Sequence, residues 1–292
     1  MSLTSFLNNK DVKERFRQEF AKPKLGEKKE LLAPPRSKRL SLVGTAFDYL
    51  LRFRLQRLNP EAIRQQWVAK EAILRLSIGN INGATYDIDT GTIEGTNDPL
   101  VDKAERYFND AWIEHERYIG TGKLTDSLIR STLRLAQLDT YYRSGYIDEN
   151  FGRTYKADID DLRQLLDLVN LEQFRAERLC MLNPTFGDAS RLVSGADADL
   201  LIDDTLIDIK TTRRFELRRE YFDQLMGYYT LYKLGGIGGL TPIPEITKVA
   251  IYFARYSYLR VFELKDIIQV ATFPDFIQWF AARAKARRPL NG

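Results

Sequence analysis

The chain has 292 residues, of which 44% are hydrophobic and 29% charged, a composition typical of a globular protein with one large domain or two small ones. Its single cysteine, Cys180, and single histidine, His115, exclude an intrachain disulfide, a Cys/His zinc site and a cysteine-ligated iron–sulfur cluster. Any metal site must therefore use carboxylates, which prefer hard ions such as Mg²⁺ or Mn²⁺.

The formal net charge of +4 is unevenly distributed along the chain. Residues 1–40 carry a net charge of +6 and residues 281–292 carry +4, which leaves −6 for the middle of the chain. Basic ends on an acidic body fit a polyanionic partner such as DNA, although solvated basic tails explain the charge equally well. The sequence has neither a run of ~18 apolar residues nor the apolar segment of a signal peptide. We therefore expect a cytoplasmic protein without a membrane partner.

The first elements in chain order are an arm and a helix. Residues 1–40 are predicted to form a basic N-terminal arm, because Lys22–Arg39 is rich in lysine, arginine and proline. Thr45 is then expected to cap a helix that turns Phe47, Leu50, Leu51 and Phe53 inward. Asp48 lies in the first turns of this helix.

The following residues change from a helical pattern to a mixed one. Residues 60–78 and 99–180 are mostly helical in pattern, and residues 190–212 have the pattern of short strands. A single domain over residues 41–292 is therefore expected, with a mixed α/β core and a helical insertion at about 60–180. The expected helices are 60–78, Leu100–Tyr118, Thr125–Tyr142, Asp158–Arg178, Phe215–Leu234 (stopped by Gly235 and Gly236) and Asp275–Ala286, and the later strands are Lys248–Phe253 and Tyr258–Leu264.

Two short apolar runs, Leu200–Ile202 and Leu206–Ile209, flank the pair Asp203 and Asp204. This pattern predicts a β-hairpin with a two-residue turn, since aspartate tolerates the left-handed backbone that such turns need. If Ile202 pairs with Thr205, Asp199 lies opposite Asp208, and Asp197 lies opposite Lys210. Directly opposed side chains share one face of the sheet, so the four charged residues are expected to form one patch.

Carboxylates placed opposite each other repel and are costly to remove from water, so such a pair usually holds a cation. Two carboxylates, water and a phosphate oxygen would fill the octahedral shell that Mg²⁺ demands. Lys210 would then orient or deprotonate the attacking water and offset charge on the phosphate. The alternative is a surface hairpin with an exposed, salt-bridged face.

The segment around these residues resembles the motif of the PD-(D/E)XK nuclease superfamily, with Asp199 as the first acid and Asp208 to Lys210 as its D-x-K. Gln224 and Tyr228, four residues apart on one helical face, are similar to the Q-x-x-x-Y motif of the RecB-like and Cas4-like branch. Gly44 to Asp48 resembles the G-x-x-x-H motif of that branch, with an aspartate in place of the histidine. The resemblance covers residues 43–53 and 195–232, and the cluster cysteines of Cas4 proteins are absent.

The resemblance implies a restriction-endonuclease-like core, in which helices flank a mixed central sheet, and a Mg²⁺-dependent deoxyribonuclease in which Mn²⁺ can substitute. Asp199, Asp208 and Asp48 would bind the metal together with the Ile209 carbonyl. Lys210, Gln224 and Tyr228 would be the catalytic residues. Glu177, placed on a helix before the hairpin, rivals Asp48 as the helix-borne ligand. The other possibility is a protein that kept this fold but lost catalysis and serves as a nucleic-acid-binding or structural module.

Overall fold

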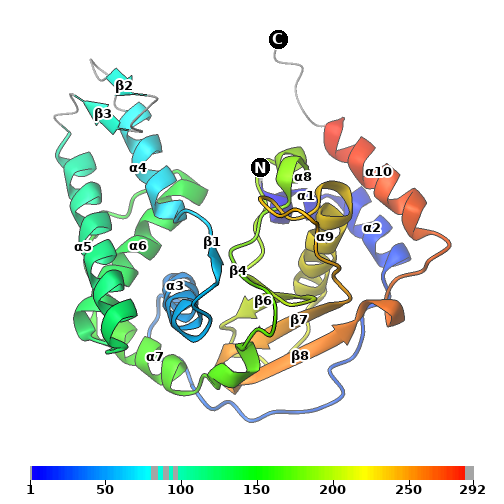
Figure 1. The fold of residues 1–292 in the computed structure, drawn as a ribbon, viewed down its shortest axis with the longest axis horizontal. Helices are drawn as coiled ribbons and strands as arrows, with labels where there is room; N and C mark the ends of the chain where they lie inside the picture. Colours follow the sequence, from blue (N-terminus) through cyan, green and yellow to red (C-terminus); the bar gives the residue numbers. More distant parts are fainter. Residues whose placement is uncertain (1, 80–84, 88–91, 95–97, 287–292) are drawn as a thin grey trace. The chain divides into compact units, whose positions relative to one another are not determined.

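The computed structural model describes residues 2–79, 85–87, 92–94 and 98–286 (Figure 1). The chain divides into two units by its internal contacts. The sheet unit comprises Met1–Leu32, Glu61–Gln65 and Asn170–Gly292, and the helical unit comprises Ala33–Pro60 and Gln66–Val169. No helix in the described ranges has the length and apolar character needed to cross a bilayer.

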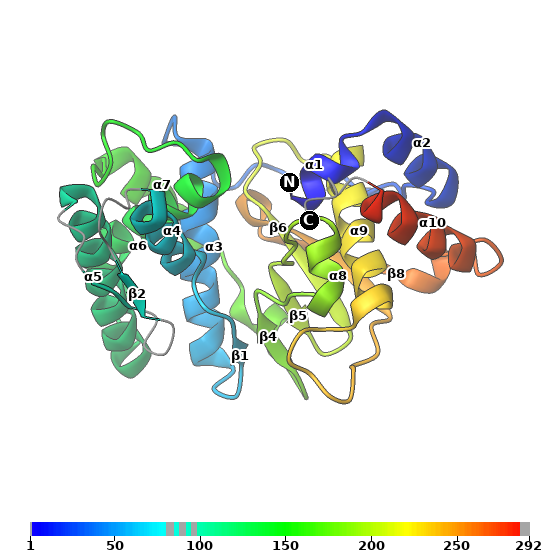
Figure 2. The same cartoon turned by 90° about the horizontal axis from the view of Figure 1, so that it is seen from above.

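The helical unit is a bundle in which α6 packs against α3, α4 and α5 (Figure 2). Local signals set the ends of its longest helices. Asp98 caps α5 by accepting from the Leu100 N–H, and Thr125 caps α6 in the same way. Both helices end at glycines with positive φ, Gly122 and Gly145. The elements are α3 (Leu40–Leu58), α4 (Val68–Gly79), β2 (Thr85–Asp87), β3 (Thr92–Glu94), α5 (Pro99–Thr121), α6 (Asp126–Ser144) and α7 (Lys156–Asp167).

Three predicted helix boundaries in this part of the chain were wrong. Thr45 does not cap a helix, because α3 already begins at Leu40 and the Thr45 hydroxyl donates to the Ser41 carbonyl inside it. The helix predicted over 60–78 begins only at Val68, after the short strand β1 (Ile63–Arg64). The helix predicted over 158–178 ends at Asp167, and a 3₁₀ turn, η1 (Leu171–Phe174), follows.

The sheet unit contains a six-stranded mixed sheet in the order β1-β4-β5-β6-β7-β8. The pairs β1–β4 and β6–β7 are parallel and the other neighbours are antiparallel. The predicted mixed sheet flanked by helices is therefore confirmed, and its identity as a nuclease core stays a prediction. The strands are β4 (Cys180–Leu182), β5 (Leu200–Ile202), β6 (Thr205–Lys210), β7 (Lys248–Phe253) and β8 (Tyr258–Glu263).

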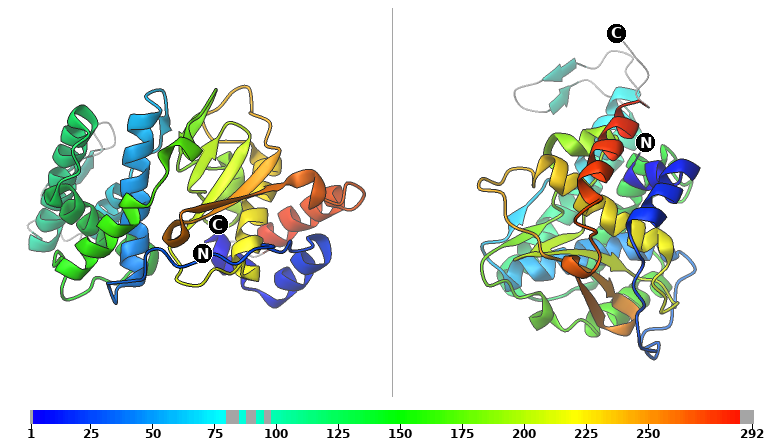
Figure 3. Two further views of the ribbon diagram at one scale, coloured as in Figure 1. Left: turned by 90° about the horizontal axis from the view of Figure 1, so that it is seen from below. Right: turned by 90° about the vertical axis from the view of Figure 1, so that its right-hand side faces the viewer.

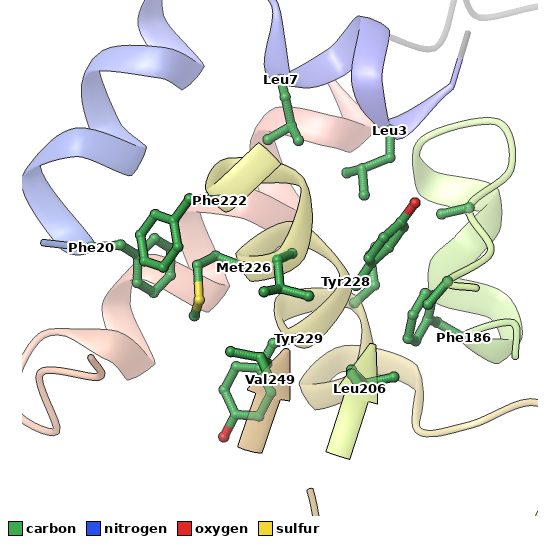
Figure 4. Packing of buried hydrophobic residues seen from close by; sticks show 14 of the residues in the cluster. Leu3, Leu7, Phe20, Phe186, Leu206, Phe222, Met226, Tyr228, Tyr229 and Val249 are labelled. Carbon is green, nitrogen blue, oxygen red and sulfur yellow. The ribbon is translucent and has the colours of Figure 1, made fainter. Parts of the chain in front are cut away.

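One face of this sheet is covered by α9 (Arg219–Gly235), which packs against β6 and β7 (Figure 1). Leu206 and Val249 on the strands meet apolar side chains of α9 such as Met226 (Figure 4). Helices α1 (Leu3–Leu7), α8 (Gly187–Leu192) and α10 (Phe273–Lys285) pack on α9 in turn (Figures 2 and 3).

The first 20 residues are not part of an arm. Residues 3–19 form α1 and α2 (Lys10–Glu19), and their apolar side chains are buried in the core of the sheet unit. The Phe16 ring packs edge-on against Phe276 of α10 at a centroid distance of 5.1 Å. Only the stretch from Phe20 to Arg39 is extended. The predicted helical insertion at about 60–180 likewise differs from the helical unit, which also includes α3 and ends at Val169.

The contact of α2 with α9 depends on one arginine. Arg219 donates from Nη2 to the Phe16 carbonyl (2.8 Å), from Nη1 to the Phe20 carbonyl (3.0 Å) and from Nε to Asp223 (2.8 Å). Because Arg219→Ala strands the buried Asp223 and two carbonyls at the end of α2, we expect it to lower the free energy of unfolding by about 3 kcal/mol. Urea titration measures this loss. Arg219→Lys keeps the charge but not the several N–H donors of the guanidinium group, so it should lose less stability. A loss under ~1 kcal/mol in the alanine variant would show that Arg219 does not hold α2 against α9.

Candidate active site at the open end of the hairpin

The predicted hairpin is confirmed. β5 and β6 pair from Ile202↔Thr205 to Leu200↔Ile207, so the turn lies at Asp203 and Asp204. Asp203 adopts a left-handed φ of 51°. One step beyond the last pair, at the open end, this register places Asp199 opposite Asp208. The Asp199 Oδ2 accepts a hydrogen bond from the Ile209 N–H at 2.5 Å, which holds this carboxylate against β6.

Asp208 is a buried carboxylate, with only 1% of its surface exposed. Its Oδ1 accepts a hydrogen bond from the Lys210 Nζ at 3.0 Å. Its Oδ2 lies 2.7 Å from the same Nζ as an ion pair, but outside hydrogen-bond geometry, so this buried oxygen has no hydrogen-bond partner in the described part of the chain. Burial raises the pKa of Asp208, and Lys210 offsets only part of that effect. A buried acceptor left in this state costs stability and calls for a further partner.

A chain of hydrogen bonds leads from Asp208 to α9. Lys210 donates to the Gln224 Oε1 at 3.0 Å, and the Gln224 Nε2 donates to the Tyr228 hydroxyl at 2.7 Å. Burial alone would lower the pKa of Lys210, but the charges of Asp208 and Asp199 outweigh it and raise this pKa. The ammonium group is therefore kept charged between the two carboxylates.

Tyr228 extends this chain into the core. Its ring stacks on Phe186 at a centroid distance of 5.7 Å (Figure 4). Burial raises the pKa of the Tyr228 hydroxyl well above its ordinary value, and the charges of Asp208, Asp199 and Asp197 raise it further. The hydroxyl therefore stays protonated, and the three acidic side chains lie near enough to act on the same group.

The predicted pairing of Asp197 with Lys210 is not found. The described β5–β6 ladder ends at Leu200↔Ile207, and Asp197 forms its bridge with Thr185 on the other side. Asn183 explains the difference, because its N–H donates to the Asp199 carbonyl at 2.9 Å and draws this segment toward the residues that follow β4.

The two predicted helix-borne ligands are placed differently from each other. Asp48 lies on α3 in the helical unit, where it pairs with Arg52 at 2.5 Å; its approach to the hairpin stays a prediction. The placement of Glu177 on a helix was wrong. Glu177 is exposed, follows η1, and donates its N–H to the Asp203 carboxylate at 3.1 Å. It therefore lies at the turn of the hairpin, whereas Asp199 and Asp208 lie at the open end.

Sequence reasoning missed two residues beside the site. Asn183 has a left-handed φ of 61° and is 7% exposed; the Asn183-Pro184 dipeptide, a typical turn signal, could have found it. Tyr221 presents its ring to the Lys210 Nζ, 5.0 Å from the centroid. Its position three residues before Gln224 puts both side chains on one helical face, which was the available signal.

The donor set can hold a cation only with help from water and main chain. Among the described residues, no three His, Cys, Asp or Glu side chains gather as a metal-binding group. The fit depends instead on Asp199 and on Asp208, whose buried Oδ2 lacks a hydrogen-bond partner. Carboxylate oxygens are the ligands that Mg²⁺ and Mn²⁺ prefer. No family model, no curated protein and no solved structure matches this chain.

Proposed function

We propose that the protein is a Mg²⁺-dependent nuclease that hydrolyses phosphodiester bonds in DNA. The observation that carries the proposal is the buried Asp208, with one oxygen lacking a hydrogen-bond partner, placed across the hairpin from Asp199 and beside Lys210. Asp199 and Asp208 would hold the ion with the Ile209 carbonyl. Mn²⁺ would serve as a substitute.

Charge balance supports a cation at this place. Asp199, Asp208 and Lys210 together carry −1, and Asp208 is nearly inaccessible to water. Lys210 compensates only one of the two carboxylates, and an added divalent cation would compensate the other. The alternative of an exposed salt-bridged face does not fit a carboxylate that is 1% exposed. A catalytically inactive relative that binds nucleic acid remains the second candidate, tested by the cleavage assay below.

The bound ion and Lys210 would have different roles in hydrolysis. When bound, Mg²⁺ polarises a phosphoryl oxygen and lowers the pKa of a coordinated water. Lys210 is aimed by Asp208 and Gln224, so it can donate to the phosphate or hold the attacking water. Neutralising the two carboxylates would leave burial as the main influence on the pKa of Lys210, and burial lowers it. The same side chain could then accept a proton from water.

A cleavage assay tests the proposal directly. Purified protein is incubated with labelled linear duplex, circular duplex and single-stranded DNA, and with single-stranded RNA, each with EDTA, Mg²⁺ or Mn²⁺. We expect cleavage of DNA only with a divalent ion and none by Asp208→Asn. Cutting of the circle would show endonuclease action. No cleavage of any substrate in Mn²⁺ would contradict the proposal and favour the inactive relative.

Tyr228 allows a finer test of the hydrogen-bond chain. Tyr228→Phe removes the hydroxyl that accepts from Gln224 but keeps the ring on Phe186, so Gln224 and Lys210 lose alignment without a change in the core. We expect single-turnover cleavage to slow about 10-fold at saturating Mg²⁺, because one orienting hydrogen bond contributes about 1.4 kcal/mol. Tyr232→Phe is the matched control. Its hydroxyl donates to the Pro244 carbonyl, so its cleavage rate should equal that of the wild type.

A further inference from the structure

The segment that joins Lys210 to α9, Thr211–Arg218, carries three arginines and one glutamate, a net charge of +2. We call it the arginine strap. Arg213, Arg214 and Arg218 are all exposed. The strap follows the proposed catalytic lysine directly, and the proposed site itself is rich in negative charge. A polyanion bound at that site needs cations nearby to offset the repulsion of the carboxylates.

Three side-chain donors hold the backbone of the strap. Arg255 donates from Nε to the Thr211 carbonyl at 2.8 Å, and the Tyr256 hydroxyl donates to the Arg213 carbonyl at 2.6 Å. Lys22 donates to the Leu217 carbonyl at 2.9 Å. These donors come from the 3₁₀ turn η2 (Ala254–Tyr256) and from the extended N-terminal stretch, both far away in the sequence.

Buried residues fix the strap in one position. Arg255 is completely buried, and burying a guanidinium group costs several kcal/mol unless its hydrogen bonds are made. Phe215, in the middle of the strap, packs its ring against Phe253 and Tyr256 at 5.1 and 5.0 Å. The strap is thus a fixed structure whose cationic side chains point away from the core.

The arginine side chains themselves remain available. Within the residues that the structure describes, neither Arg213 nor Arg214 forms an ion pair. Arg218 forms a hydrogen bond with Tyr221 and an exposed pair with Glu220 at 3.4 Å, and such exposed pairs contribute little. Its guanidinium lies over the ring of Tyr221, 5.4 Å from the centroid, and Lys210 contacts the same ring at 5.0 Å. Tyr221 therefore connects the strap to the site.

We propose that the arginine strap binds the sugar–phosphate backbone of a DNA strand next to the phosphate to be cleaved. Guanidinium groups fit phosphate oxygens in two-pronged geometry, and a fixed backbone lowers the entropy lost on binding. Because these contacts reach only phosphates, they carry no sequence preference. The inference deepens the proposed function and rests on it for the identity of the polyanion.

The test measures DNA binding rather than cleavage. Arg213→Gln/Arg214→Gln is compared with wild type in EDTA, by fluorescence anisotropy of a labelled 20-nucleotide DNA as single strand and as duplex. Each lost phosphate contact removes a log–log salt slope of about 0.9 for duplex and about 0.7 for single strands. Between about 50 and 200 mM salt, wild-type duplex affinity should therefore fall about 12-fold further than that of the variant.

Two further double variants test whether the loss of positive charge must lie in the strap. Arg17→Gln/Arg178→Gln removes the same charge from exposed positions elsewhere in the sheet unit and should keep the wild-type slope. Arg213→Lys/Arg214→Lys should restore most of the slope. An unchanged slope in the glutamine pair, an equal loss in the control pair, or no DNA binding by wild type would overturn the strap proposal. A wild type that binds through the strap but never cleaves would overturn the nuclease proposal alone.

Discussion

Lys210→Ala and Asp208→Asn should both reduce DNA cleavage by about 1000-fold or more, because one removes the group that handles the water and the other a ligand charge. They should differ in metal binding. Lys210→Ala keeps both carboxylates and loses a nearby positive charge, so it should bind Mn²⁺ at least as tightly as wild type. Asp208→Asn should bind the ion poorly.

Thermal melts with and without Mn²⁺ separate these outcomes. A ligand at ~100 times its dissociation constant stabilises the folded state by about 2.7 kcal/mol, which raises the melting temperature of a chain of this size by about 5 °C. We expect this rise in wild type and in Lys210→Ala, and its loss in Asp208→Asn. A wild type whose melting ignores Mn²⁺ would defeat the metal site.

The melts without metal carry a second part of this prediction. Lys210→Ala leaves Asp208 buried without its cation, so it should lose about 3 kcal/mol, and Mn²⁺ should restore much of that loss. Asp208→Asn removes a charge that faces Asp199, so it should lose under ~1 kcal/mol. A purely structural ion pair predicts instead that both variants are destabilised and that neither responds to Mn²⁺.

Gly235→Ala should be the most damaging single methyl addition in the sheet unit. A Cβ at Gly235 would lie 2.4 Å from the Phe186 carbonyl oxygen, 2.8 Å from the Ala189 Cβ and 3.0 Å from the Ala189 nitrogen. Two of these atoms are backbone, so relief requires α8 to move away from α9. We expect a loss of about 3 kcal/mol or more in unfolding free energy, at the upper end for overpacking.

The effect should reach the candidate site, because Phe186 stacks on Tyr228. Cleavage by the folded fraction of Gly235→Ala should therefore slow, as in Tyr228→Phe. Gly120→Ala is the matched control: it lies inside α5, and among the described residues no atom beyond its chain neighbours and the local helix backbone lies within 4 Å of its added Cβ. That variant should gain up to about 1 kcal/mol from helix propensity. A Gly235→Ala protein as stable as Gly120→Ala would show that α8 and α9 do not pack this closely.

Local patterns were enough to predict the elements that position the site. The two-residue turn at Asp203 and Asp204 determines the register of β5 and β6, and a one-residue slip would move every side chain to the other face. The same pattern placed Asp208 and Lys210 on one face. The strand Lys248–Phe253 was predicted with its observed boundaries, because its apolar run is bounded by clear turn residues. The end of α9 at Gly235 followed from a stop signal, whereas its predicted start at Phe215 was wrong, because the helix begins only at Arg219.

Only the tertiary structure decided which polar groups are buried and what they lack. The Asp208 Oδ2 is buried without a hydrogen-bond partner among the described residues because α9 packs over β6. No local sequence pattern predicts this packing. The support of the arginine strap by Lys22 and Arg255 joins residues far apart in the sequence, so no spacing rule could predict it. The basic composition of residues 1–40 predicted a solvated arm, although α1 and α2 bury apolar side chains. Such burial depends on a partner surface that the rest of the chain forms, so the local sequence does not predict it.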